Sequence, residues 1–166
     1  MKPFYKFVIV ATAILLLLGI VFFDNIRGYY RFKQYCEKEG GLRIYEPLEK
    51  NVGWVAEDEY EARAASLLEH VSYVRYINKY DGKAYDLKYL GGDSQLDNSY
   101  EITPEDISKS VYYAWVSVHK SVNQELRMSK FGYEVIDIKK SKVAARYYSF
   151  SYSKFDRDSA LLDMPS

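Results

Sequence analysis

The stretch Tyr73–Leu90, YVRYINKYDGKAYDLKYL, decides the fold. Asp81-Gly82 at its centre is typical of a two-residue turn between antiparallel strands. Pairing outward from this turn gives the cross-strand pairs Tyr76–Leu87, Val74–Tyr89, Ile77–Asp86 and Arg75–Lys88. One face is then mostly aromatic and apolar and the other mostly polar, as a half-buried β-hairpin requires.

A second interpretation of this stretch stays open. Val71, Val74 and Ile77 also follow helical spacing, so a helix could continue through residues 71–80. The tyrosines and the symmetric turn favour the hairpin.

The segments around the hairpin predict helices first and mostly strands later. Glu57–His70 is expected to be a helix, with acidic residues in its first turn and a buried face that includes Tyr60 and Leu67. Thr103-Pro104 is expected to begin a helical turn. Further strands are expected at Leu42–Tyr45, Val111–His119, Phe131–Ile138 and Val143–Tyr152. The predicted fold class is α+β, with a mainly antiparallel sheet of about five or six strands covered by one or two helices.

An apolar segment near the N-terminus predicts a transmembrane helix. Phe7–Phe23, FVIVATAILLLLGIVFF, has no charged residue, and it extends to Phe4 if the Lys6 side chain snorkels. The extended segment reaches the length of about 20 residues that a bilayer core needs. A cleaved signal peptide is disfavoured, because bulky residues end the segment and no small-residue cleavage site follows.

These features divide the chain into four expected regions. They are a tail and transmembrane anchor (1–23), a juxtamembrane helix (24–40), a soluble α+β domain (41–153) and a flexible tail (154–166). The expected location is a bacterial inner membrane, crossed once, with the soluble domain in the periplasm. The Lys and Arg count alone slightly favours a cytoplasmic domain, whereas the short N-terminal tail favours export.

Charge and cysteine content exclude several classes of function. Lys2 and Lys6 are the only charged residues among the first 23, so the rest of the chain carries 21 basic and 23 acidic residues. A nucleic-acid partner is therefore not expected, since phosphate binding needs a basic surface. The single cysteine, Cys36, excludes an intramolecular disulfide, and no spacing indicates a metal site or a cofactor.

Cys36, His70 and His119 are the candidate catalytic residues, and each has a simpler explanation. Cys36 lies in the last turn of a predicted helix, on the same face as Tyr29 and Phe32, where a buried structural thiol is favoured over a nucleophile. The two histidines are far apart in sequence and no carboxylate motif accompanies them. The sequence therefore favours no catalytic site.

Tyrosine is the unusual residue of this chain, with 18 in all. Aromatic faces can bind glycans or proteins, and the hairpin would present Tyr76, Tyr85 and Tyr89 on one face. The alternative is ordinary packing within a sheet, because tyrosine is a favoured strand residue.

Cys36–Glu46, CEKEGGLRIYE, resembles a pattern of small uncharacterised bacterial envelope proteins. These have an N-terminal hydrophobic segment, a cysteine, a Gly-Gly pair and an Ile-Tyr-Glu strand. Val135–Ile138 followed by Val143–Tyr147 is similar to their C-terminal hairpin. The resemblance covers about 25 residues; it implies a bacterial source and an envelope location, but no activity.

The expected function is that of a membrane-tethered, non-enzymatic interaction module that binds another envelope protein. One alternative is an envelope hydrolase or carbohydrate-acting enzyme, in which Cys36 or a carboxylate meets a histidine in one pocket. Another is a purely structural role, with every aromatic side chain buried. The sequence does not indicate the oligomeric state.

Overall fold

The computed structural model describes residues 2–124 and 127–153; within the first helix it leaves out the side chains of residues 2–4, 6, 20–22 and 24. The expected flexible tail, 154–166, lies outside the described residues. The chain forms two compact units. Among the described residues, unit 1 contains 2–40, 120–124, 127–130 and 149–153, and unit 2 contains Gly41–His119 and Phe131–Tyr148.

Unit 1 is built on one long helix, α1 (Lys2–Glu39), which ends where Gly40 donates its N–H to the Cys36 carbonyl. Strand residues of the same unit pack against it. The Phe32 and Tyr152 rings stack with centroids 6.0 Å apart, and the Tyr152 hydroxyl donates to the Asn25 carbonyl at 2.8 Å. Gly28 leaves room for the Tyr152 ring, since a Cβ there would lie 2.5 Å from it.

The predicted transmembrane helix is wrong. Among the residues that the structure describes, no helix is both long enough and apolar enough to cross a membrane. The predicted single-pass inner-membrane location, with a periplasmic domain, is corrected with it.

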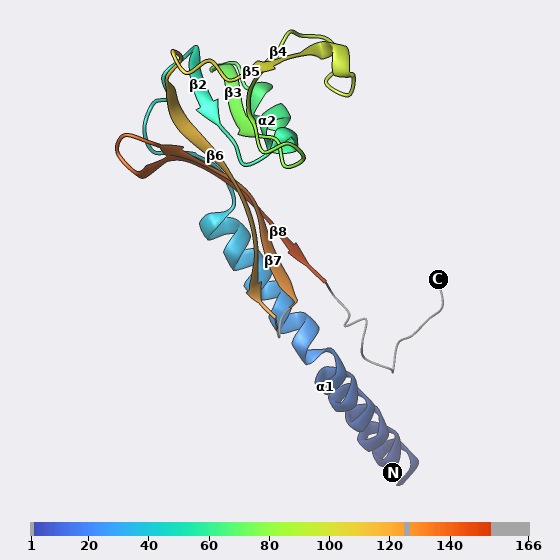
Figure 1. Ribbon diagram of the computed structural model, residues 1–166. Helices are drawn as coiled ribbons and strands as arrows, with labels where there is room; N and C mark the ends of the chain where they lie inside the picture. The colour runs from blue at the N-terminus through green and yellow to red at the C-terminus, as the bar shows by residue number, and fades with distance from the viewer. Residues whose placement is uncertain (1, 125–126, 154–166) are drawn as a thin grey trace. The chain divides into compact units, whose positions relative to one another are not determined.

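Unit 2 is organised around a mixed β-sheet (Figure 1). The strand order is β1-β8-β7-β6-β2-β3-β4-β5. The strands are β1 (Gly41–Ile44), β2 (Val52–Val55), β3 (Val71–Ile77), β4 (Ala84–Tyr89), β5 (Tyr100–Pro104), β6 (Val111–Asn123), β7 (Met128–Asp137) and β8 (Lys142–Tyr152). A short 3-10 helix, η1 (Asp97–Ser99), precedes β5.

The sheet differs from the predicted mainly antiparallel one of about five or six strands, because it has eight strands and mixed pairing. Strand β2 pairs in parallel with both β3 and β6. It was missed because Val52-Gly53-Trp54-Val55 is short and lacks polar–apolar alternation, as is usual for a strand covered on both faces.

The central hairpin is confirmed, and residues 71–77 are a strand rather than a helix. Its register differs from the predicted one by two residues, with Tyr76 opposite Tyr85 and Arg75 opposite Asp86. The turn is wider than Asp81-Gly82, because the Asn78 N–H donates to the Lys83 carbonyl and closes a longer loop. A shift of two residues keeps each side chain on its predicted face.

The helical turn predicted at Thr103-Pro104 is a strand end instead. Pro104 lies opposite Tyr85 in β5, the last strand of the sheet. The next residue, Glu105, donates its N–H to Ala84, so the nitrogen of Pro104 points away from β4 and no ladder bond is lost.

Helix α2 (Glu59–Ser66) packs against β3 and β4 (Figure 1). Its N-cap is Asp58, whose side chain accepts the Glu61 N–H at 3.0 Å. Small residues, Ala62, Ala65 and Ser66, form the buried face, which corrects the predicted face with Tyr60 and Leu67. The core beneath includes Trp54, Val74, Tyr76, Leu87, Tyr113, Trp115 and Val135.

Candidate functional site

The sequence-predicted catalytic candidates lie in unpromising surroundings. Burial, with a smaller effect of the Glu37 charge, raises the pKa of the Cys36 thiol, which disfavours the thiolate. His119 is exposed, and the Nδ1 atom of His70 is buried without a hydrogen-bond partner. Within the described part of the chain, no three His, Cys, Asp or Glu side chains are grouped to hold a metal ion.

The three tyrosines predicted to bind a partner lie in different environments. Tyr76 is buried under α2 and its ring stacks on that of Tyr85 at 6.0 Å. Tyr85 donates its hydroxyl to Asp81 at 2.7 Å. Tyr89 packs on Tyr100 and lines a pocket. They therefore share no exposed surface, and a binding role for Tyr89 stays a prediction.

A buried ion pair organises the other face of the β3–β4 hairpin. Arg75 donates from Nε and Nη2 to the two carboxylate oxygens of Asp86 at 2.8 and 3.1 Å. Its Nη1 lies 3.0 Å from Glu105, and Nη2 also donates to the Asp106 carbonyl at 2.7 Å. The Asp106 N–H donates back to Asp86, so the pair fixes the loop after β5 to the sheet.

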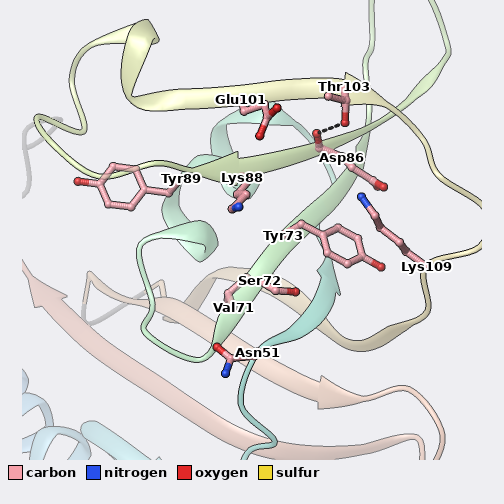
Figure 2. A pocket seen from close by; sticks show the side chains of 10 residues that line it. All are labelled: Asn51, Val71, Ser72, Tyr73, Asp86, Lys88, Tyr89, Glu101, Thr103 and Lys109. Carbon is pink, nitrogen blue, oxygen red and sulfur yellow. Dashed lines mark hydrogen bonds between the residues drawn. The ribbon is translucent and has the colours of Figure 1, made fainter.

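A polar pocket of about 640 Å³ lies beside this pair (Figure 2). Tyr73 from β3, Lys88 from β4 and Glu101 from β5 line it, and Lys109 extends toward the Tyr73 ring, with its Nζ atom 5.5 Å from the ring centroid. Gly53 makes room for that ring, because a Cβ there would lie 2.3 Å from it. The Tyr73 hydroxyl donates to the Ser110 carbonyl at 3.0 Å.

The acidic side chains that line this pocket are Asp86 and Glu101. Asp86, its buried carboxylate, is fully engaged by Arg75 and Asp106. Neither a histidine nor a cysteine lines it. The predicted meeting of Cys36 with a histidine in one pocket therefore does not occur in this pocket.

A second surface is formed by the beginning of α2 and the beginning of the β3–β4 turn. Tyr60 and Tyr80 are 80% and 101% exposed, and both line a hollow of about 230 Å³. Asp58, Glu59, Asn78 and Lys79 complete its lining. We call Tyr60, Tyr80, Asp58 and Glu59 the acidic aromatic patch.

The charge around this patch is negative. Residues 57–63 and 78–83 carry five acidic and three basic side chains. Lys79 lies across the hollow, with its Nζ 2.9 Å from Asp58 and 3.8 Å from Glu57. The Glu61 N–H and Lys79 lower the pKa of the Asp58 carboxyl, which keeps it ionised.

Sequence reasoning missed both sites, although the ion pair left a signal. The predicted register placed Arg75 against Lys88, a like-charge pair that is unfavourable on adjacent strands. The alternative register, which brings Arg75 to Asp86, removes this conflict.

No protein-family model, curated protein or solved structure matches this chain.

Proposed function

We propose that this chain is a non-enzymatic interaction module that binds a basic segment of another protein at the acidic aromatic patch. The observation that carries the proposal is the high exposure of Tyr60 and Tyr80 around a hollow lined by carboxylates. Exposed aromatic rings supply large contact areas at protein interfaces. A cation between such rings gains from the ring faces and from the nearby carboxylates.

Lys79 supports this assignment, because it is a cation already held at the hollow. Its side chain is 61% exposed, and exposed ion pairs contribute little to stability. An incoming arginine can therefore displace it at small cost. A guanidinium also stacks on tyrosine and binds carboxylates through two parallel hydrogen bonds, which an ammonium group cannot do.

The test uses fluorescence anisotropy of labelled peptide pools on the full chain, one pool rich in Arg and Lys and one rich in Asp and Glu. The basic pool is expected to bind more tightly, and more weakly as salt is added. Tyr80→Ala and Tyr60→Ala are each expected to weaken the binding of the basic pool about 5- to 30-fold, which corresponds to about 1–2 kcal/mol per contact residue.

Ile107→Ala is the matched control, because Ile107 is 88% exposed and lies outside the patch. It should leave binding unchanged. Equal binding of the two pools, or an equal loss in the control, would refute the proposal.

A further inference from the structure

The polar pocket beside the Arg75–Asp86 pair lies wholly within unit 2 and is independent of the acidic aromatic patch (Figure 2). Its volume of about 640 Å³ falls within the range of small-molecule sites, roughly 300–1,000 Å³. The Tyr73 ring has a fixed position in it, because Gly53 leaves room for the ring and the Tyr73 hydroxyl donates to the Ser110 carbonyl. The pocket therefore has an aromatic wall whose position is set before a ligand binds.

Most charged groups in and around the pocket already have partners. Asp86 accepts hydrogen bonds from Arg75 and from the Asp106 N–H, and Arg75 also lies 3.0 Å from Glu105. The Lys109 Nζ lies 3.7 Å from the Asp106 carboxylate. Together these residues carry two basic and three acidic groups, so they do not favour a purely anionic ligand.

Lys88 and Glu101 are the remaining charged residues of the lining, and they lie directly opposite each other on β4 and β5. Residues in this relation share one face of the sheet, with Cβ atoms about 4.5–5.5 Å apart. Neither side chain forms an ion pair with a residue in the described part of the chain. One cation and one anion are thus available side by side in the pocket.

A ligand with a single kind of charge fits this arrangement poorly, because Glu101 repels an anion and Lys88 repels a cation. We propose that the pocket binds a small zwitterion, a molecule with one ammonium and one carboxylate group such as a free α-amino acid. Glu101 accepts hydrogen bonds from the ammonium group, and Lys88 donates to the carboxylate. The Tyr73 ring supplies contact area to the rest of the molecule.

The test titrates four free amino acids, L-leucine, L-phenylalanine, L-glutamate and L-lysine, into the full chain and follows the backbone amides of Tyr73, Lys88 and Glu101 by NMR. Each amino acid is compared with its N-acetyl form, which lacks the ammonium group, and with its carboxamide, which lacks the α-carboxylate. At least one free amino acid is expected to shift these amides and to bind at least fivefold more tightly than both of its blocked forms.

Two variants identify which protein group recognises which end of the ligand. Glu101→Gln should remove the preference for the free amino acid over its N-acetyl form, and Lys88→Met should remove the preference over the carboxamide. Both side chains are exposed, so neither substitution disturbs the core. Glu69→Gln and Lys142→Met are the matched controls, exposed and outside the pocket lining, and they should keep both preferences.

Absence of amide shifts with all four amino acids would overturn the proposal, and so would equal affinity for the free and blocked forms. Preferences that survive in both pocket variants would also overturn it, because binding would then depend on groups other than Lys88 and Glu101.

Discussion

Replacing Arg75 with methionine should destabilise unit 2 strongly. The side chains of Arg75 and Asp86 are 14% and 3% exposed, so the variant leaves a buried carboxylate without its cation. Asp86 would lose two charge-assisted hydrogen bonds and keep the one from the Asp106 N–H. At about 1.5–3 kcal/mol each, and consistent with broken buried ion pairs, the loss is about 3–5 kcal/mol.

Urea unfolding followed by tryptophan fluorescence measures this loss. Trp54 and Trp115 are the only tryptophans of the chain and both lie in the unit 2 core, so the signal reports that unit. With a urea dependence of about 2 kcal/mol/M, the midpoint should fall by about 2 M.

A double variant separates the energy of the Arg75–Asp86 interaction from the energy of packing around these two side chains. Asp86→Asn alone should cost less, because Arg75 keeps Glu105 and the Asp106 carbonyl as partners. Arg75→Met combined with Asp86→Asn should recover part of the loss, since no charge is then left buried. A loss below about 1 kcal/mol for Arg75→Met, or strictly additive effects in the double variant, would refute the reasoning.

Three further changes test other parts of unit 2. Gly132→Ala should lower the free energy of unfolding in urea by more than about 3 kcal/mol, because Gly132 has φ +149° and a Cβ there would lie 1.9 Å from the Tyr147 carbonyl oxygen. The control Gly82→Ala should cost about 1 kcal/mol, because a Cβ at Gly82 meets no atom within 4 Å. Similar losses in the two variants would contradict this prediction. Burial, followed by the Glu59 charge, raises the pKa of Tyr76 to about 12, above its ordinary value of 10.0. As pH rises, the Tyr76 hydroxyl therefore ionises in the unfolded chain before it ionises in the folded one, so the stability contributed by Tyr76 should disappear between pH 10 and about 12. If the free energy of unfolding falls with pH equally steeply in Tyr76→Phe, this prediction is contradicted. Asp58→Ala should cost about 1 kcal/mol and Asp58→Ser much less, because the serine can still cap α2; equal losses would show that capping is not the cause.

The β-hairpin shows which features of the fold can be predicted from the sequence. Alternation of apolar and polar residues predicted the two strands and their faces, because side-chain direction depends only on the period of two. Register depends on the turn, where Asn78 and Lys83 close a wider loop than Asp81-Gly82 suggested. The opposite charges of Arg75 and Asp86 would have indicated the observed register.

The candidate sites were harder to predict, because each depends on contacts between distant elements. The acidic aromatic patch joins the start of α2 to the β3–β4 turn, and Tyr60 had been expected to be buried. It is exposed because the helix packs through Ala62 and Ala65, whose small side chains allow a close approach to the sheet. Helical spacing alone does not distinguish these two faces when both contain apolar residues.

The position of β2 has a consequence for how the chain acquires its structure during synthesis. Its neighbours in the sheet are β3, which follows soon after it in the chain, and β6, which begins only at Val111. The partner of β1 is β8, which is synthesised later still. Strands β3, β4 and β5 pair each with the next along the chain, so they can form while the rest is still on the ribosome. Strand β2 must therefore remain incompletely paired until β6 emerges, and β1 until β8 emerges. This is the interval in which a chaperone would be most useful.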